Sequence, residues 1–204
     1  MGETADAPKL EVLTIGHSNR SLEEFLALLK QHGVEVLADV RSQPHSKYVP
    51  HFDAASLKRA VEAAGLQYVF LGRELGGMPE GREFYDAEGH AVYSRIAASE
   101  PFRRGIARLL EGIRKYRVAI MCGEEDPTNC HRRLLVGKVL TGQGVGVRHI
   151  RSDGRIQTEE ELVQQEQAGQ VNQLELGFAG SEEESWTSTQ SVSRRKRPSS
   201  SSGR

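Results

Sequence analysis

The sequence lacks a long apolar run and an excess of charge of either sign, and each absence excludes a class of function. No stretch approaches the roughly 18 consecutive apolar residues that a membrane-spanning helix needs, and residues 1–10 lack the apolar run of a signal peptide. We therefore expect a cytoplasmic protein with no membrane partner. A formal net charge of −1 provides no overall positive field for bulk binding to DNA.

Cysteine is also scarce, since Cys122 and Cys130 are the only two among 204 residues. Two cysteines are too few for a disulfide scaffold, and a reducing compartment keeps them as thiols unless they are catalytic or metal-bound. The Cys-x7-Cys-His spacing, taken together with His17, suggests zinc, yet paired zinc-binding cysteines usually lie about two to four residues apart. We therefore predict no cofactor, with zinc as the alternative.

Hydrophobic periodicity alternates between short β-branched runs and amphipathic helices. A capping box at residues 21–24 and a glycine at position 33 mark the two ends of the first helix. Strands are predicted at 11–15, 34–40, 66–71, 118–121 and 147–150, with helices near 21–33, 53–65, 101–113 and 130–140. This alternation predicts an α/β fold with a doubly wound, mainly parallel sheet of about five strands and helices on both faces.

The chain is predicted to hold a single domain with extensions at both ends. Residues 1–10 form an N-terminal extension and residues 11–156 the α/β domain. The Gln- and Glu-rich residues 157–178 predict a peripheral helical extension, and the Ser-rich, charged residues 179–204 a disordered tail. Residues 72–99 are a glycine-rich loop long enough to be a lid or a binding loop.

Four different motifs lie at the ends of predicted strands, and together they resemble a known family. They are Thr14–Ser18, Asp39–Ser42 with Pro44, Leu75–Gly77, and Met121–Cys122 with Cys130–Arg132. In this order, over residues 11–150, they resemble the family called domain of unknown function 488 (DUF488). The resemblance implies a bacterial α/β protein and names no reaction. One departure is Gly123, where the family often has alanine, and it loosens the loop after the strand.

These motifs all follow the carboxyl ends of predicted parallel strands, which is where doubly wound sheets bind ligands. Asp39 and Arg41 lie two residues apart on a strand, so their side chains point to the same face. They either serve a substrate or form a buried ion pair. His17, on the turn after the first strand, is either a general base or a helix-capping residue.

The Cys130-His131-Arg132 run begins a predicted helix, whose free N–H groups and dipole favour an anion. The same position lowers the pKa of a thiol, which makes Cys130 a candidate nucleophile with His131 as its proton partner. Arg132 is a candidate anion ligand. Alternatively, Glu124 and its acidic neighbours neutralise the arginines on a solvated surface. Cys122 is a second thiol for disulfide exchange or a small core residue.

We therefore predict an enzyme that binds a small anionic substrate, such as a phosphate-bearing nucleotide, or a nucleic-acid end. The catalytic candidates are His17, Asp39, Cys130 and His131. The substrate-binding candidates are Ser18, Arg41, Ser42, Tyr48, Gly76, Gly77, Cys122, Glu124 and Arg132. Thiol exchange or sulfur transfer through the two cysteines is one alternative. A non-catalytic anion- or nucleic-acid-binding module is the other.

Overall fold

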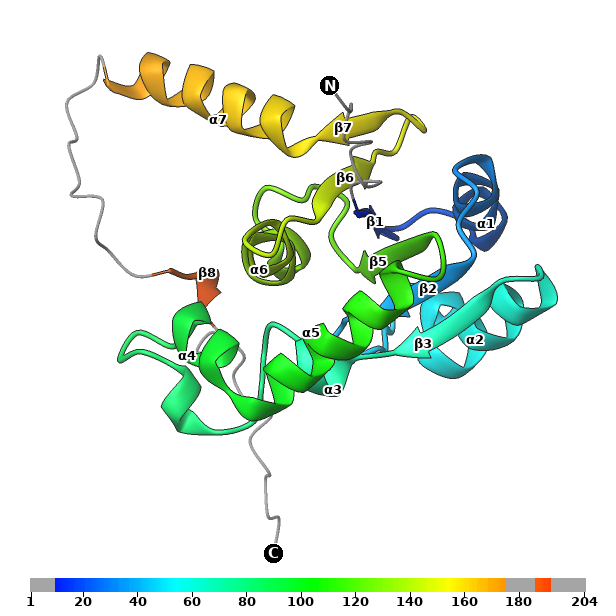
Figure 1. Ribbon diagram of the computed structural model, residues 1–204, viewed down its shortest axis with the longest axis horizontal. Coiled ribbons are helices and arrows are strands. Elements are labelled where there is room, and N and C mark those ends of the chain that lie inside the picture. The colour runs from blue at the N-terminus through cyan, green and yellow to red at the C-terminus, as the bar shows by residue number, and fades with distance from the viewer. Residues whose placement is uncertain (1–9, 175–185, 192–204) are drawn as a thin grey trace, which may run out of the picture.

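The computed structural model describes residues 10–174 and 186–191, and its centre is a six-stranded sheet (Figure 1). The strands are β1 (Glu11–Gly16), β2 (Val36–Asp39), β3 (Gln67–Phe70), β5 (Val118–Cys122), β6 (Gly146–Ile150) and β7 (Ile156–Thr158). They are ordered β3-β2-β5-β1-β6-β7. All neighbours pair in parallel except β6 and β7, which are antiparallel. This arrangement confirms the predicted doubly wound α/β class.

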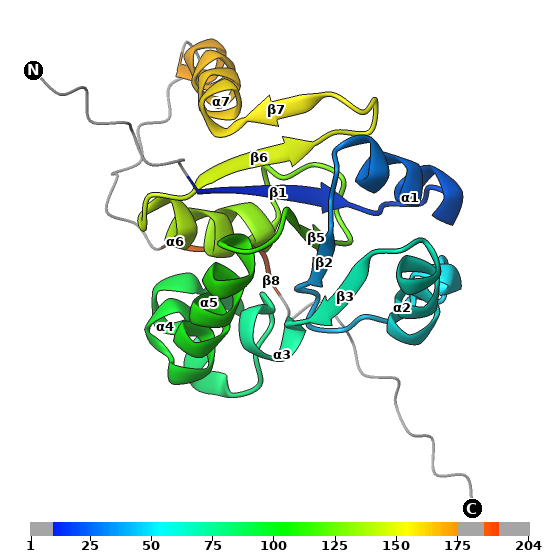
Figure 2. The ribbon, with the colours of Figure 1, turned by 45° about the vertical axis from the view of Figure 1, so that its right-hand side comes forward.

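Helices cover both faces of the sheet (Figure 2). One face carries α1 (Leu22–Gln31) and α2 (Ala54–Ala63), with η1 (Pro50–Phe52) between β2 and α2. The other carries α3 (Gly72–Leu75), α4 (Tyr93–Ala98), α5 (Glu100–Ile113), the π-helical η3 (Arg132–Gly137) and α6 (Lys138–Thr141). A hydrophobic core lies on each face of the sheet, and side chains of β1 alternate between them. Leu13 and Ile15 pack in the core with α1, while Val12 packs in the core on the opposite face.

Helix α1 begins where the sequence places it, and the reason is local. The Ser21 hydroxyl accepts a hydrogen bond from the Glu24 N–H, and the Glu24 carboxylate accepts one from the Ser21 N–H. This capping box satisfies two backbone donors that a helix start leaves without partners. Phe25 and Leu29 are fully buried on its inner face. Within the described ranges, no helix has the length and apolar character needed to cross a membrane.

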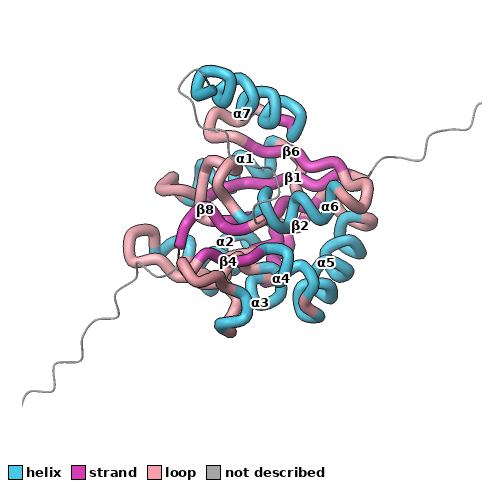
Figure 3. Tube along the Cα trace, turned by 90° about the vertical axis from the view of Figure 1, so that its left-hand side faces the viewer, coloured by secondary structure: helices cyan, strands magenta, loops and turns pink. Residues whose placement is uncertain are grey.

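Two regions differ from the sequence prediction. Residues 72–99 are not one open loop but contain α3, η2 (Arg82–Phe84), β4 (His90–Val92) and α4. Within the predicted disordered tail, residues 187–191 form β8 (Thr187–Ser191), which pairs antiparallel with β4 (Figure 3). The rest of residues 179–204, apart from Trp186, lies outside the described residues, as does most of the extension 1–10. A two-stranded ribbon between segments so distant in sequence leaves no periodic signal in either one.

The predicted peripheral extension begins with a strand. Residues 156–158 form β7 against β6, and α7 (Glu159–Leu174) then runs outside the sheet edge (Figure 1). Residues 175–178 lie outside the described part of the chain.

The end of β1 lies so close to the loop after β5 that only glycine fits at position 16. A Cβ built on Gly16 would overlap the carbonyl oxygen of Glu124. That carbonyl belongs to backbone, which cannot move away as the tip of a flexible side chain can. The contact fixes the distance between the two loops that carry the candidate site residues.

We expect Gly16→Ala to lower the free energy of unfolding by about 1–3 kcal/mol, because overpacking forces the backbone to shift. Gly112→Ala is the matched control. Its Cβ would meet only Val118 at 3.8 Å, and alanine is the better helix former by up to about 1 kcal/mol. Urea unfolding followed by circular dichroism compares the two variants. Equal stability of both would contradict the close contact at Gly16.

Candidate functional site

The carboxyl edge of the sheet brings six of the thirteen predicted site residues into two groups around the end of β5. The first group, here called the thiol centre, comprises Cys122, Cys130 and His131. The second, here called the imidazole cluster, comprises His17, Asp39 and Arg41. Backbone hydrogen bonds join the two regions, because the His17 N–H donates to the Cys122 carbonyl at 3.0 Å.

In the thiol centre, two sulfur atoms and a ring nitrogen lie together below the surface. The Cys122 Sγ, Cys130 Sγ and one His131 ring nitrogen are all within 4.8 Å of one another. Both cysteines are free thiols and buried, with 8% and 3% of their surface exposed. Cys122 is the last residue of β5. The loop after β5 then connects it to Cys130, which lies just before the next helical segment.

The orientation of the His131 ring is set by the backbone around it. Its Nε2 lies 3.0 Å from the Val40 carbonyl oxygen, so Nε2 carries the hydrogen and donates it there. The lone pair is therefore on Nδ1, which is 3.7 Å from the Cys122 Sγ. A Cβ on Gly77 would lie only 2.6 Å from the ring, so glycine at 77 allows the close approach. Gly77 thus shapes the centre by leaving space.

The two thiols lie within 4.8 Å of each other, and their interaction shifts the two pKa values in opposite directions. Donation from Cys122 lowers the pKa of Cys130 well below its ordinary value, and the Arg132 charge and His131 act in the same direction. The pKa of Cys122 is raised, first by the same bond and then by burial. Loss of one proton therefore produces a Cys130 thiolate that accepts from a Cys122 thiol.

In the imidazole cluster, Asp39 and Arg41 form a buried ion pair. The Arg41 Nε and Nη2 donate to the two Asp39 carboxylate oxygens at 2.9 and 2.7 Å. Arg41 also donates to the Phe52 carbonyl at 2.8 Å, and the Tyr68 hydroxyl donates to Asp39 at 2.8 Å. The sequence leaves open whether Asp39 and Arg41 serve a substrate or form a buried ion pair, and the structure contains the ion pair. Tyr68, which sequence reasoning missed, completes it from β3.

His17 has no free nitrogen in this arrangement. Its Nδ1 is 2.7 Å from the Ser18 carbonyl, to which it donates, and its Nε2 accepts from the Arg41 Nη1 at 3.2 Å. The ring also stacks on Phe52 with a centroid distance of 4.3 Å. Burial lowers the pKa of His17 to about 4, so the ring is neutral at pH 7. This placement suits a positioning role rather than the predicted general base.

Arg132 points into the protein and not toward solvent. It is fully buried, and its two terminal nitrogens donate to the carbonyls of Glu124 and Glu125 while its Nε donates to the Thr14 hydroxyl at 3.2 Å. Its neighbour Arg133 is held by carboxylates, with Nε 2.7 Å from Glu159. Arg132 therefore holds the loop after β5, and its three donor nitrogens are all used within the protein.

The predicted acidic surface patch also has a different arrangement. The Glu124 side chain is exposed, and the Glu125 and Asp126 carboxylates pair with Arg151 at 3.0 and 3.5 Å. The contacts from Glu124 and Glu125 to Arg132 come from backbone carbonyls. The acidic side chains therefore do not neutralise Arg132.

The remaining predicted residues lie around the two groups or away from them. The Ser42 hydroxyl accepts from the Met78 N–H at 2.9 Å, and a Cβ on Gly76 would overlap that hydroxyl, so both shape the loop beside Gly77. Tyr48 is 95% exposed, and the structure does not bring it to either group.

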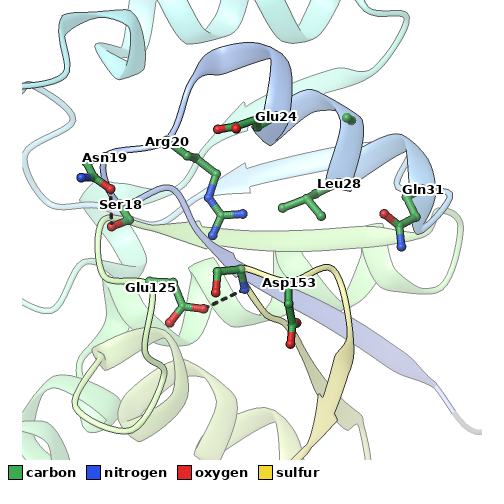
Figure 4. A pocket seen from close by; sticks show the side chains of 10 residues that line it. Ser18, Asn19, Arg20, Glu24, Leu28, Gln31, Glu125 and Asp153 are labelled. Atoms are coloured by element: carbon green, nitrogen blue, oxygen red, sulfur yellow. Dashed lines mark hydrogen bonds between the residues drawn. The ribbon is translucent and has the colours of Figure 1, made fainter.

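A cavity of about 420 Å³ opens next to the imidazole cluster, between α1 and the turn that joins β6 to β7 (Figure 4). Ser18 and Glu125 line it, and the Arg20 side chain extends into it. Ser18 adopts a left-handed backbone with φ of 49°. The cysteines do not line this cavity. Sequence reasoning passed over Arg20 because a single arginine before a helix cap carries no motif.

Comparison with known proteins identifies a family. Residues 21–139 match the family described as "Domain of unknown function DUF488". Two crystal structures described as "Putative phosphatase (DUF442)" from Shewanella putrefaciens CN-32 are 18% and 19% identical, with TM-scores of 0.38 for each. The first match covers 68% of each chain, and the second covers 67% of this chain and 70% of the other. No curated protein matches the sequence.

We expect Arg132→Met to lower the free energy of unfolding by about 1–3 kcal/mol or more, because it leaves two partly buried carbonyls and a buried hydroxyl without the donors that Arg132 supplies. Arg148→Met is the matched control. Arg148 is 42% exposed and makes one ion pair with Glu11, which predicts a change below about 1 kcal/mol. Chemical unfolding measures both. A loss at Arg132 no larger than that at Arg148 would show that the buried contacts carry no stability.

Stability is expected to fall as the pH drops from 6.5 to 4. The folded pKa of His17, about 4, lies below its ordinary value of 6.5, so in this window the unfolded chain binds a proton that the folded chain does not. The loss attributable to His17 is at most about 3 kcal/mol, and above pH 6.5 it vanishes.

Urea midpoints between pH 4 and 7 test this dependence, with His17→Gln as the variant that removes the titrating group. His45→Gln, at a side chain that is 76% exposed, is the control. The His17 variant should show a shallower loss in this window than wild type. Identical slopes in all three proteins would overturn the assignment.

Proposed function

The chain belongs to the DUF488 family, and we propose that it is an enzyme that acts by thiol chemistry, with Cys130 as the nucleophilic thiolate and Cys122 as its thiol partner. The family name specifies no reaction, so the proposal stands on the site. The single observation that carries it is that two free thiols and a ring nitrogen of His131 lie within 4.8 Å of one another. We also propose the cytoplasm as its location, because a reducing compartment regenerates thiols.

The alternative of an anionic substrate held by Arg41 and Arg132 receives less support from the contacts. The Arg41 guanidinium is used by Asp39, Phe52 and His17. The Arg132 guanidinium is likewise used by the protein, through hydrogen bonds to two backbone carbonyls and a hydroxyl. An anion would have to displace these bonds. The two thiols, by contrast, are free and already lie within 4.8 Å of each other.

The proposed reaction is thiol–disulfide exchange with a small disulfide. The Cys130 thiolate attacks one substrate sulfur, which forms a mixed disulfide and releases the other half as a thiolate. The Cys122 thiol then transfers its proton to the His131 Nδ1 and attacks the Cys130 sulfur. This step breaks the mixed disulfide, releases the second thiolate and leaves a Cys122–Cys130 disulfide. The substrate is reduced by two electrons, and an external dithiol returns the protein to its starting state.

Each surrounding group has a stated part in this chemistry. The Arg132 guanidinium lowers the pKa of Cys130 and so favours its thiolate form. The Val40 carbonyl fixes the His131 tautomer, so that its lone pair faces Cys122. Because both cysteines are more than nine-tenths buried, we propose a small molecule and not a folded protein as the substrate.

We expect Cys130 to be alkylated by iodoacetamide well below pH 8, where an ordinary cysteine with a pKa near about 8.5 is mostly protonated. Thr141→Cys supplies an exposed cysteine on the same chain as the internal reference, and peptide mass spectrometry reads both sites. Cys122→Ala removes the donor to Cys130 and should move the alkylation profile of Cys130 to higher pH. Mild oxidation of wild type should give an intramolecular disulfide.

Two results together would contradict the proposed thiol chemistry. If Cys130 reacts no more readily than the introduced cysteine at any pH below 8, and no Cys122–Cys130 disulfide forms on oxidation, the protein does not use its thiols in this way. Circular dichroism of each variant confirms that the comparison is between folded proteins.

A further inference from the structure

We propose that Cys122, Cys130 and His131 also form a binding site for one zinc ion, through the two Sγ atoms and Nδ1, and that bound zinc holds the thiols in an unreactive form. The site uses the side chains of the proposed function but depends only on their placement. It goes beyond the sequence prediction, in which His17 is grouped with the Cys-x7-Cys-His residues and the cysteine spacing disfavours zinc.

The spacing of the three donor atoms fits zinc. In a tetrahedral site with Zn–S near 2.3 Å and Zn–N near 2.0–2.1 Å, sulfur and nitrogen ligands lie about 3.6 Å apart and two sulfurs about 3.8 Å apart. The Cys122 Sγ and His131 Nδ1 are 3.7 Å apart, and all three donor atoms lie within 4.8 Å. Side-chain rotations that move the donor atoms by at most about 1 Å would bring all three to the distances that one zinc ion requires.

The tautomer of His131 is the one that a metal needs. A zinc-binding histidine presents one lone pair and commonly donates its other N–H to a carbonyl or carboxylate, which fixes the ring. In this chain the Val40 carbonyl takes the Nε2 hydrogen at 3.0 Å, and Nδ1 faces the sulfur. His17, by contrast, uses both nitrogens within the protein. His131 and not His17 is therefore the nitrogen ligand.

Charge gives a further reason. Two adjacent buried thiolates repel each other and are poorly solvated, whereas a divalent cation between them makes the group neutral overall. Sulfur and imidazole donors together select zinc over magnesium or calcium, which bind oxygen. The donors come from the end of β5 and the start of the helical segment that contains η3, so rigid elements hold them.

Three protein ligands leave one position of a tetrahedral ion for water or another small ligand, as in catalytic and not structural zinc sites. Zinc binding and disulfide formation exclude each other, because both use the two sulfur atoms. Zinc would therefore protect the pair from oxidation, and its removal would return the reactive dithiol.

Cobalt(II) titration of the reduced, metal-free protein tests the site, because thiolate ligation to cobalt gives charge-transfer absorption in the near ultraviolet. We expect one cobalt per chain, displaced by one zinc. Cys122→Ser, Cys130→Ser and His131→Gln should each weaken binding at least tenfold, whereas His45→Gln, at an exposed side chain, should leave it unchanged. Circular dichroism checks that each variant is folded.

A second measurement needs no variant. Zinc added to wild type should slow iodoacetamide alkylation of both cysteines, and a chelator should restore it. Without any cobalt–thiolate band in a protein whose cysteines are freely alkylated, the metal site is overturned and the thiol proposal survives. A cobalt band together with ordinary thiol reactivity in the metal-free protein supports the metal site and overturns the thiol proposal. Wild-type affinity in both serine variants overturns the metal site.

Discussion

The arrangement of the thiol centre depends on one buried cation. The Arg132 guanidinium donates to the carbonyls of Glu124 and Glu125 and to the Thr14 hydroxyl, so it ties the loop after β5 to the interior of the sheet. That loop connects Cys122 to Cys130, and its path decides whether the two sulfurs meet. No carboxylate of the described residues contacts this guanidinium, so its positive charge is not neutralised by a counter-ion. That charge lowers the pKa of Cys130 and favours the thiolate. The same side chain thus fixes the geometry and the acidity of the thiol centre.

The imidazole cluster contributes rigidity on the other side of β5. Asp39 orients Arg41, and Arg41 donates to a neutral His17 that also stacks on Phe52. A neutral ring avoids an unpaired charge beside the buried Asp39–Arg41 ion pair, and desolvation accordingly lowers the pKa of His17. The His17 backbone in turn holds the Cys122 carbonyl. An interconnected polar network of this kind restricts the loops around it to one arrangement.

The sequence is informative where structure is set locally and uninformative where it is set by distant contacts. The buried β-branched strands, the Ser21–Glu24 capping box and the meeting of motifs at the carboxyl edge all follow from patterns within short segments. The inward direction of the Arg132 side chain does not follow from such a pattern. Residues 132–137 form a π-helix, so the α-helical period of about 3.6 residues no longer predicts which side chains face the core. Likewise, β8 exists only through its pairing with β4, and the tautomer of His131 is fixed by Val40 from another strand.

Two neighbouring thiols below a protein surface have three ways to avoid the cost of two buried charges. They can share one proton, form a disulfide, or bind a divalent cation. The first is favoured in the free thiols, because the pKa of Cys130 is lowered while that of Cys122 is raised, so that only one of the two loses its proton readily. The other two use both sulfurs, so the ratio of oxidant to zinc around the protein selects between them. Because the His131 Nδ1 accepts a proton in one case and binds the metal in the other, its fixed tautomer serves both states.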